Sequence, residues 1–211
     1  MVNQIDRFKY YEEYGEYDGW LTVNSPAALF GTDEIEIVGN CITKPPLSTK
    51  ELNTINFLKK EFPQIYKTVL DTLFALQEDG PIKWEIFNSE DYSFSPITFS
   101  NSSEIHSYIG KPAFQILTDT VKDDYTYFAL SFFKDNHLSI EHGFTFVFYK
   151  NSLIHLDFTD DISTVEGIYY YEQDPAKWKE GLWKVMFEAV KERNQNDKEL
   201  IRSKWLQEKY Y

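Results

Sequence analysis

Residues 125–161 read YTYFALSFFKDNHLSIEHGFTFVFYKNSLIHLDFTDD, and this stretch decides the fold. It is the densest apolar region of the chain, and its apolar side chains recur with a period of two, which is typical of β-strands. The pattern predicts strands at residues 125–133, 144–149 and 153–158. The turn Lys150-Asn151-Ser152 is too short for a parallel crossover, so the last two strands should pair antiparallel.

A further strand is predicted just upstream, at residues 114–120, followed by the short polar turn at residues 121–124. Four successive strands joined mainly by short turns are expected to form an antiparallel meander. Because successive side chains of a strand point to opposite faces, one face should be apolar and the other mixed. The apolar row is Phe144, Phe146 and Phe148, and the mixed row is Thr145, Val147 and Tyr149.

The apolar face of this meander needs a cover, and residues 48–78 have the pattern of one. Ser48 and Glu51 form a capping box, in which each residue can bond the backbone N–H of the other. Apolar residues then follow at helical spacing. Pro63 either kinks this helix or begins a second one. We therefore expect a kinked or paired helical unit packed on the sheet.

The remaining segments complete the expected architecture. Residues 1–18 are predicted to be an irregular or partly helical lead-in, and short strands are predicted at 20–23, 35–38 and 84–87. A Ser/Asn-rich connection and a short helix at 104–108 should follow the last of these. Toward the C-terminus, Asp174-Pro175 is typical of a helix start, and a more charged helix is expected from residue 197.

The predicted fold class is α+β: an antiparallel β-sheet of about six strands, which includes the meander, is covered by the kinked helical unit and followed by a C-terminal helical pair. We expect one α+β domain at residues 1–171. Residues 172–211 are expected to be a helical extension packed on the same domain.

Composition and charge limit the function classes. The chain has 211 residues, of which 42% are hydrophobic and 18% aromatic, enough for a sizeable core. A formal net charge of −13 argues against a nucleic-acid backbone or an anionic membrane as the main partner. An acidic surface can serve solubility alone, or it can be a docking face for a basic protein.

Cysteine usage and hydropathy indicate the compartment. The single cysteine, Cys41, rules out an intrachain disulfide and a zinc cluster built from several cysteines, and it fits a reducing cytoplasm. The first residues, MVNQIDRFKYYEEYGEYDGW, contain no apolar signal-peptide core. No run approaches the roughly 20 apolar residues that a membrane-spanning helix needs. We expect a cytoplasmic protein.

Glu141-His142-Gly143 is the most distinctive short motif, and two interpretations of it stay open. With a turn at Asn151-Ser152, His142 would lie opposite Asp161, so that His142, Glu141 and one of the nearby aspartates could bind a metal for hydrolysis. Alternatively, Glu141 or His142 bonds backbone groups where a strand begins, and Gly143 supplies a positive φ, a close backbone approach or a bulge. No phosphate-binding loop or nucleophile elbow is present, and no cofactor is predicted.

Two further groups are candidate binding residues. His155 and Asp157 alternate on one strand face, so they are expected to form a solvent-side pair, which could titrate near neutral pH or simply be polar surface. Consecutive tyrosines such as Tyr169 and Tyr170 cannot all point inward from a strand. Interleaved with acids, they are either a protein-binding surface or a cover for a sheet edge.

Residues 20–161 resemble an uncharacterised bacterial domain family. The resemblance rests on the acidic strand from Phe30-Gly31 to Val38, on Pro46-Leu47-Ser48 with its helical unit, and on Glu141-His142-Gly143 with a following strand pair that ends in Asp. Some members lie near toxin–immunity loci, so the resemblance implies an immunity-like or other binding role. We therefore expect a non-enzymatic protein-binding module with a basic protein partner; the alternative is a metal-assisted hydrolase centred on residues 141–143.

Overall fold

The structure is a computed structural model, and it describes residues 7–11, 13, 16–24, 33–37, 47–78, 83–88, 93–138 and 143–157. The helical pair expected at residues 172–211 and the boundary expected at residue 171 lie outside these ranges. The described part has mixed α and β content, which confirms the α+β class. None of its helices is both long enough and apolar enough to cross a membrane.

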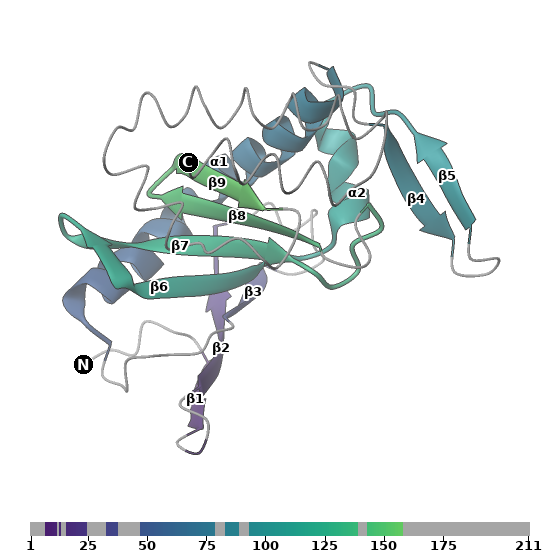
Figure 1. The fold of residues 1–211 in the computed structure, drawn as a ribbon. Coiled ribbons are helices and arrows are strands. Elements are labelled where there is room, and N and C mark those ends of the chain that lie inside the picture. Colours follow the sequence, from purple (N-terminus) through teal and green to yellow (C-terminus); the bar gives the residue numbers. More distant parts are fainter. Residues whose placement is uncertain are drawn as a thin grey trace, which may run out of the picture.

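The described strands form two sheets, a large one of seven strands and a separate hairpin (Figure 1). The order in the large sheet is β1-β2-β3-β6-β7-β8-β9. Its strands are β1 (Arg7–Tyr11), β2 (Glu16–Thr22), β3 (Glu34–Ile37), β6 (Ala113–Lys122), β7 (Tyr125–Phe132), β8 (Phe144–Tyr149) and β9 (Ser152–Asp157). The hairpin consists of β4 (Trp84–Asn88) and β5 (Ser93–Ile97), and the helices are α1 (Thr49–Glu78), the 3₁₀-helix η1 (Ser102–Ile105) and α2 (His106–Ile109).

The predicted meander is present as β6 to β9, each strand pairing antiparallel with the next. In the large sheet only the pair β3–β6 is parallel, with Glu36 opposite Ala113 and Ile37 opposite Phe114. A parallel pair needs a long crossover, and here the crossover contains α1, the β4–β5 hairpin, η1 and α2. Because the crossover joins β3 to β6, it places the N-terminal strands beside the meander in one sheet.

Two expectations about strands were wrong. Residues 1–18 were expected to be an irregular or partly helical lead-in, but they contain β1 and the start of β2, which pair antiparallel. The Ser/Asn-rich segment after β4 was expected to be a connection, yet Ser93–Ile97 is β5. With β1, the large sheet has seven strands rather than about six, whereas β5 pairs with β4 in the separate hairpin. Pro96 lowers the strand signal of β5, although an edge strand tolerates a proline.

Helix α1 is a single helix that continues through Pro63, so the alternative of two paired helices was wrong. Proline has no backbone N–H and cannot donate to the carbonyl four residues earlier, that of Lys59. The backbone N–H of Asn24 donates to this carbonyl instead, at 2.8 Å. The backbone that follows β2 thus supplies the hydrogen-bond donor that Pro63 lacks.

The predicted capping box begins this helix. The backbone N–H of Ser48 donates to Oε2 of Glu51 at 2.5 Å, and the N–H of Glu51 donates to Oγ of Ser48 at 3.3 Å. A separate polar contact joins α1 to β7. The N–H of Thr126 donates to Oγ1 of Thr54 at 2.9 Å. Both threonines are buried, so this bond satisfies polar groups that water does not reach.

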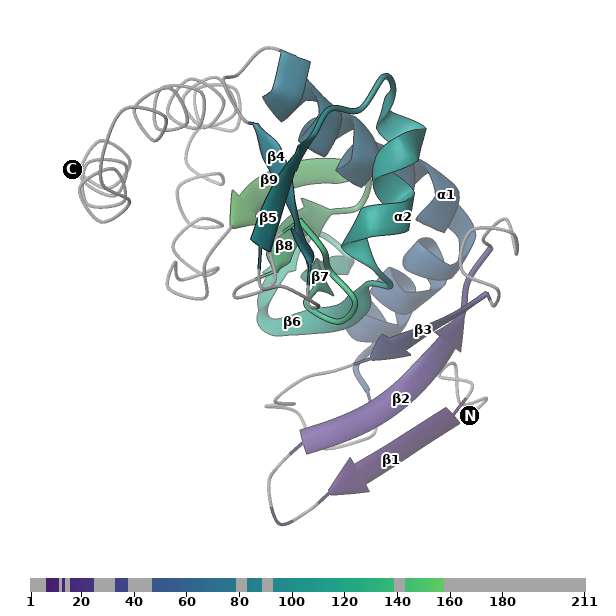
Figure 2. The ribbon, with the colours of Figure 1, turned by 90° about the vertical axis from the view of Figure 1, so that its right-hand side faces the viewer.

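The main core lies between α1 and the meander (Figure 2). Helix α1 contacts β7 and β6, and it buries apolar residues including Leu58, Phe62 and Leu73. Burying each such side chain contributes about 1.5–3 kcal/mol. The predicted row Phe144, Phe146 and Phe148 belongs to this core, which confirms the predicted apolar face.

The opposite face of the meander carries a second, smaller cluster. Tyr127, Val147 and Tyr149 are buried there together with Ala129 and Ile154. The rings of Tyr127 and Tyr149 lie 5.1 Å apart between centroids. The predicted mixed face is therefore confirmed as the side that bears Val147 and Tyr149.

Candidate functional site

The residues predicted to form a site fall in two groups. Glu141, His142, Tyr169 and Tyr170 lie outside the described residues. Gly143 and His155 are described fully, and Asp157 is described as the last backbone position of β9, opposite Thr145. The predictions about the first group therefore stay predictions.

Gly143 has both the positive φ and the close backbone approach that were expected as alternatives. Its φ is +65°, a region that favours glycine. A Cβ at this position would lie 2.4 Å from the carbonyl oxygen of Phe132 and 2.6 Å from Cδ1 of Phe133. Both the positive φ and the close backbone approach explain why glycine precedes β8.

His155 is buried, with 1% of its surface exposed, so the expected solvent-side pair with Asp157 was wrong. His155 is buried because it lies opposite Val147, on the face of the second apolar cluster, and that face is not open to solvent. A β-bulge in the β8–β9 pair sets this face. Leu153 lies opposite Phe148, whereas His155 lies opposite Val147, so Ile154 is an extra residue. The bulge reverses the alternation, and His155 consequently shares the face of the second apolar cluster.

The observed hairpin turn also differs from the expected one. Tyr149 pairs with Ser152, so the turn residues are Lys150 and Asn151 rather than Asn151-Ser152. His142 and Asp161, which the expected turn placed opposite each other, lie outside the described residues. Within the described ranges, no group of three or more His, Cys, Asp or Glu side chains gathers to hold a metal ion.

The β4–β5 hairpin has two unlike faces. On the inner face, Trp84 is buried and packs edge-on against Phe144, with ring centroids 5.9 Å apart. On the outer face, Phe87 lies opposite Phe94, and their ring centroids are 5.4 Å apart. The sequence reasoning missed this surface because it treated β5 as a connection, and the alternation of serine with apolar residues was the available signal.

The outer face of the hairpin is open to solvent. Phe94 is 56% exposed, the largest value among the exposed large hydrophobic residues of the described part. Glu85 lies opposite Pro96, and both are exposed. The outer face therefore joins an aromatic pair to a carboxylate and a proline.

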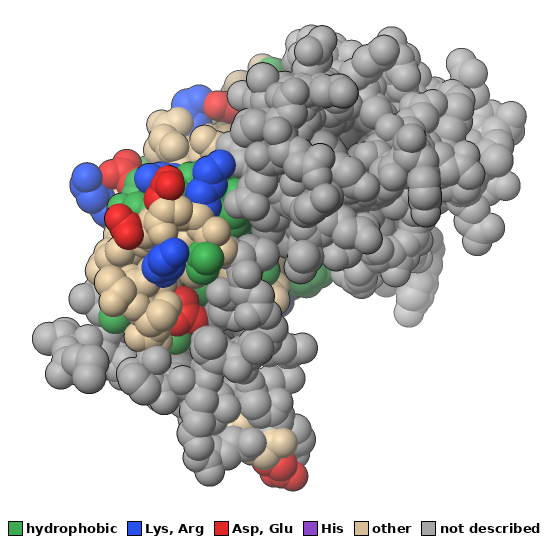
Figure 3. Space-filling model, turned by 60° about the vertical axis from the view of Figure 1, so that its left-hand side comes forward, with side chains coloured by type: hydrophobic (Ala, Val, Ile, Leu, Met, Phe, Trp, Pro, Cys, Tyr) green, Lys and Arg blue, Asp and Glu red, His purple; other side chains and the backbone are tan. Residues whose placement is uncertain are grey.

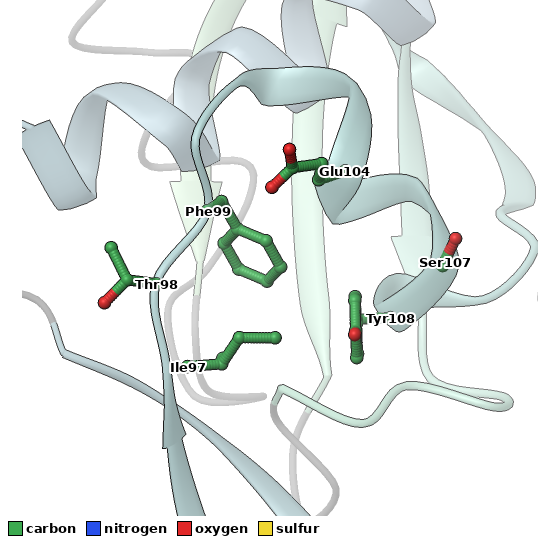
Figure 4. A pocket seen from close by; sticks show the side chains of 6 residues that line it. All are labelled: Ile97, Thr98, Phe99, Glu104, Ser107 and Tyr108. Carbon is green, nitrogen blue, oxygen red and sulfur yellow. The ribbon is translucent and has the colours of Figure 1, made fainter.

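A hollow of about 410 Å³ lies where β5 leads into η1 and α2 (Figure 4). Ile97 and Phe99 stand on its strand side, and Tyr108 stands across from them on α2. The rings of Phe99 and Tyr108 are tilted, with centroids 5.4 Å apart. The complete lining consists of Ile97, Thr98, Phe99, Glu104, Ser107 and Tyr108.

The walls of the hollow are fixed by hydrogen bonds. The side-chain amide of Gln77 donates to the carbonyl of Phe99 at 2.8 Å and accepts from its N–H at 2.9 Å. The Glu104 carboxylate accepts from the N–H of Ser100 and from Nδ2 of Asn101, each at 2.9 Å. These bonds hold one apolar wall and one acidic group in place.

Helix α2 and η1 are tied to α1 by two polar contacts. The phenol oxygen of Tyr66 lies 2.7 Å from Nδ1 of His106, and burial raises the pKa of Tyr66 above its ordinary value. Oγ of Ser102 donates to Oδ1 of Asp71 at 2.7 Å. Burial raises the pKa of the Asp71 carboxyl, but hydrogen bonds from Lys67 and Ser102 outweigh this and lower the pKa overall.

A cation–aromatic cluster closes the turn end of the meander. Nζ of Lys150 lies 4.4 Å from the ring centroid of Tyr125 and 5.3 Å from that of Tyr149. The hydroxyl of Tyr149 donates to Oδ2 of Asp123 at 2.8 Å. On the face shown in Figure 3, acidic and basic side chains of the described residues lie side by side rather than forming one acidic patch.

The chain matches no family model, no curated protein and no solved structure. The fold and the geometry above place the chain in the class of α+β proteins. The resemblance of residues 20–161 to a bacterial domain family stays a prediction.

Proposed function

We propose that this chain is a non-enzymatic protein-binding module that binds a basic protein through the outer face of the β4–β5 hairpin. The observation that carries the proposal is the exposed ring of Phe94, which stands beside Phe87 on a hairpin separate from the main sheet. Aromatic side chains are enriched in the centres of protein interfaces and supply much of their binding energy.

The chemistry of the hairpin favours contact through side chains rather than through the strand edge. Pro96 lacks an N–H, and a proline within an antiparallel pair normally turns its nitrogen away from the partner strand. The outer edge of β5 therefore lacks a donor at this position, which disfavours the addition of another strand. Phe94, Phe87 and the nearby carboxylate of Glu85 are left as the binding elements.

Charge supports a basic partner. The formal net charge of −13 accelerates the encounter with a positively charged protein, and an exposed acid such as Glu85 adds a complementary charge at the rim. The family resemblance supports an immunity-like role, in which the partner is a toxin whose surface the module covers. Within the same proposal, the net charge disfavours nucleic acid, and the single Cys41 supports a cytoplasmic location.

Affinity purification from the native organism tests the proposal. Tagged wild type, Phe94→Ser and Val121→Ser are compared; Val121 is 47% exposed on β6 and serves as a matched apolar control. We expect one basic protein to co-purify stoichiometrically with wild type and with Val121→Ser. Phe94→Ser should weaken binding of that purified partner about tenfold or more, the effect of losing an interface hot spot. Equal binding by Phe94→Ser would rule out the hairpin face.

The immunity-like role has its own test. The co-purified partner is expressed alone, with wild-type module, and with the Phe94→Ser variant. We expect growth arrest by the partner alone, rescue by wild type and loss of rescue by the variant. A partner that binds the hairpin but does not arrest growth would reject the immunity-like role and leave the binding function intact.

A further inference from the structure

The geometry points to an arginine pocket in the hollow between β5 and α2, which would hold a guanidinium side chain of the basic partner. This inference deepens the proposed binding function and rests on it. The hollow adjoins the hairpin, since Ile97 is both the last residue of β5 and part of the lining. Ile97 pairs with Trp84 and so belongs to the inner face of the hairpin, whereas Phe94 is on the outer face, so the partner's side chain reaches the hollow by passing the end of β5.

Glu104 provides the charge complementarity. Within the described part of the chain, its carboxylate forms no ion pair, and it accepts hydrogen bonds from two neutral donors, the N–H of Ser100 and Nδ2 of Asn101. One such bond reaches each oxygen. A carboxylate has about four lone-pair sites, so each oxygen can accept a second bond. The group can consequently receive both arms of a guanidinium in a bidentate pair.

The aromatic wall suits the rest of an arginine side chain. Phe99 is buried and Tyr108 is half-buried, and their rings, with centroids 5.4 Å apart, contact each other and form one aromatic wall. Aromatic faces stack on a guanidinium plane, and they also pack against the aliphatic stem of arginine. The compact, strongly hydrated ammonium of lysine matches neither the planar stacking nor the bidentate bond as well.

The pocket is held in its binding shape before a ligand arrives. The amide of Gln77 bonds both backbone groups of Phe99, and Asn101 and Ser100 fix the carboxylate of Glu104. Groups that are already ordered lose less conformational entropy on binding. A single arginine side chain should therefore bind weakly but specifically.

Titration with N-acetyl-argininamide, followed by ¹H–¹⁵N NMR spectra of the full chain, tests the pocket without the partner. We expect saturable shifts of the Ser107 and Tyr108 amides, with a dissociation constant in the millimolar range. N-acetyl-leucinamide should give no saturable shift, and N-acetyl-lysinamide should bind more weakly. Absence of saturation by argininamide, or equal binding by either of the other two amides, would overturn the inference.

Variants separate the pocket from the hairpin. Ser107→Trp fills the hollow from its exposed side and should abolish the shifts. Glu104→Gln should raise the dissociation constant about tenfold, whereas the control Glu85→Gln, an exposed acid of the hairpin, should leave it unchanged. An unchanged constant in Glu104→Gln would reject the carboxylate role. Failure of the titration while Phe94→Ser still loses the partner would reject the pocket alone, and the reverse result would reject the hairpin face alone.

Discussion

The backbone N–H of Asn24 lies 2.8 Å from the carbonyl oxygen of Lys59, the group that Pro63 leaves without its helical donor. A proline inside a long helix usually reduces stability. Here the opened carbonyl serves as an attachment point between the end of β2 and the middle of α1. The N-terminal strands and the helix therefore depend on each other.

A double-mutant cycle measures this dependence. Asn24→Pro removes the donor and should lower the free energy of unfolding by about 1–3 kcal/mol, the cost of an unsatisfied carbonyl. In a Pro63→Ala background, the new N–H of residue 63 can bond the carbonyl of Lys59, so the same change should cost less. Urea unfolding of the four proteins gives the coupling. An equal cost of Asn24→Pro in both backgrounds would contradict this explanation.

Gly143→Ala should destabilise the protein by about 2 kcal/mol or more. A left-handed conformation costs a non-glycine residue about 1–2 kcal/mol, and the added Cβ would also lie 2.4 Å from the carbonyl oxygen of Phe132. Chemical denaturation measures the loss, with Ser95→Ala on the exposed part of β5 as the control. A change as small as that of the control would show that the start of β8 tolerates a side chain.

Tyr66 should make stability depend on alkaline pH. Its folded-state pKa is raised by burial, so the neutral phenol is retained in the folded protein while the unfolded chain ionises from about pH 10. This contribution is fully present below the unfolded pKa and is lost as pH rises above it. The difference in unfolding free energy between wild type and Tyr66→Phe should therefore shrink above about pH 10. A difference that stays constant with pH would show that Tyr66 ionises equally in both states.

Trp84 should tolerate phenylalanine but not alanine. Its Nε1–H is buried and has no hydrogen-bond partner among the described residues. Trp84→Phe removes that unsatisfied donor, worth about 1–3 kcal/mol, and so offsets much of the lost packing against Phe144. We expect a net change within about 1 kcal/mol, whereas Trp84→Ala should cost about 3–5 kcal/mol. Thermal or urea unfolding distinguishes these values, and equal losses would contradict the offset.

Local patterns in the sequence predicted the parts of the fold that depend on neighbouring residues. The capping box of Ser48 and Glu51 and the alternation of Phe144, Phe146 and Phe148 each have a short-range cause, and both were confirmed. Strands β1 and β5 were missed because their own residues give only a weak strand pattern. Each is a strand because it pairs with its neighbour. The parallel pairing of β3 with β6 joins residues separated by the whole crossover, which no local pattern reports.

The candidate site was harder to predict than the fold. The extra residue Ile154 places His155 opposite Val147, on the face of the second apolar cluster, which is buried rather than open to solvent. A bulge of this kind leaves no mark in the alternation of Leu153 to Leu156 that a strand pattern can detect. The exposed Phe94 could be recognised only after β5 had been identified as a strand.

The position of the β4–β5 hairpin in the crossover affects how the amino-acid sequence can change during evolution. The two strands form a sheet of their own, so Phe94 and Glu85 take no part in the pairings of the seven-stranded sheet. Under the proposed binding function, partner choice and scaffold stability therefore depend on different residues. Descendants of this chain can alter the exposed hairpin face while Trp84, packed on Phe144, keeps the hairpin anchored. New specificities should arise from substitutions at a few surface positions, without a new fold.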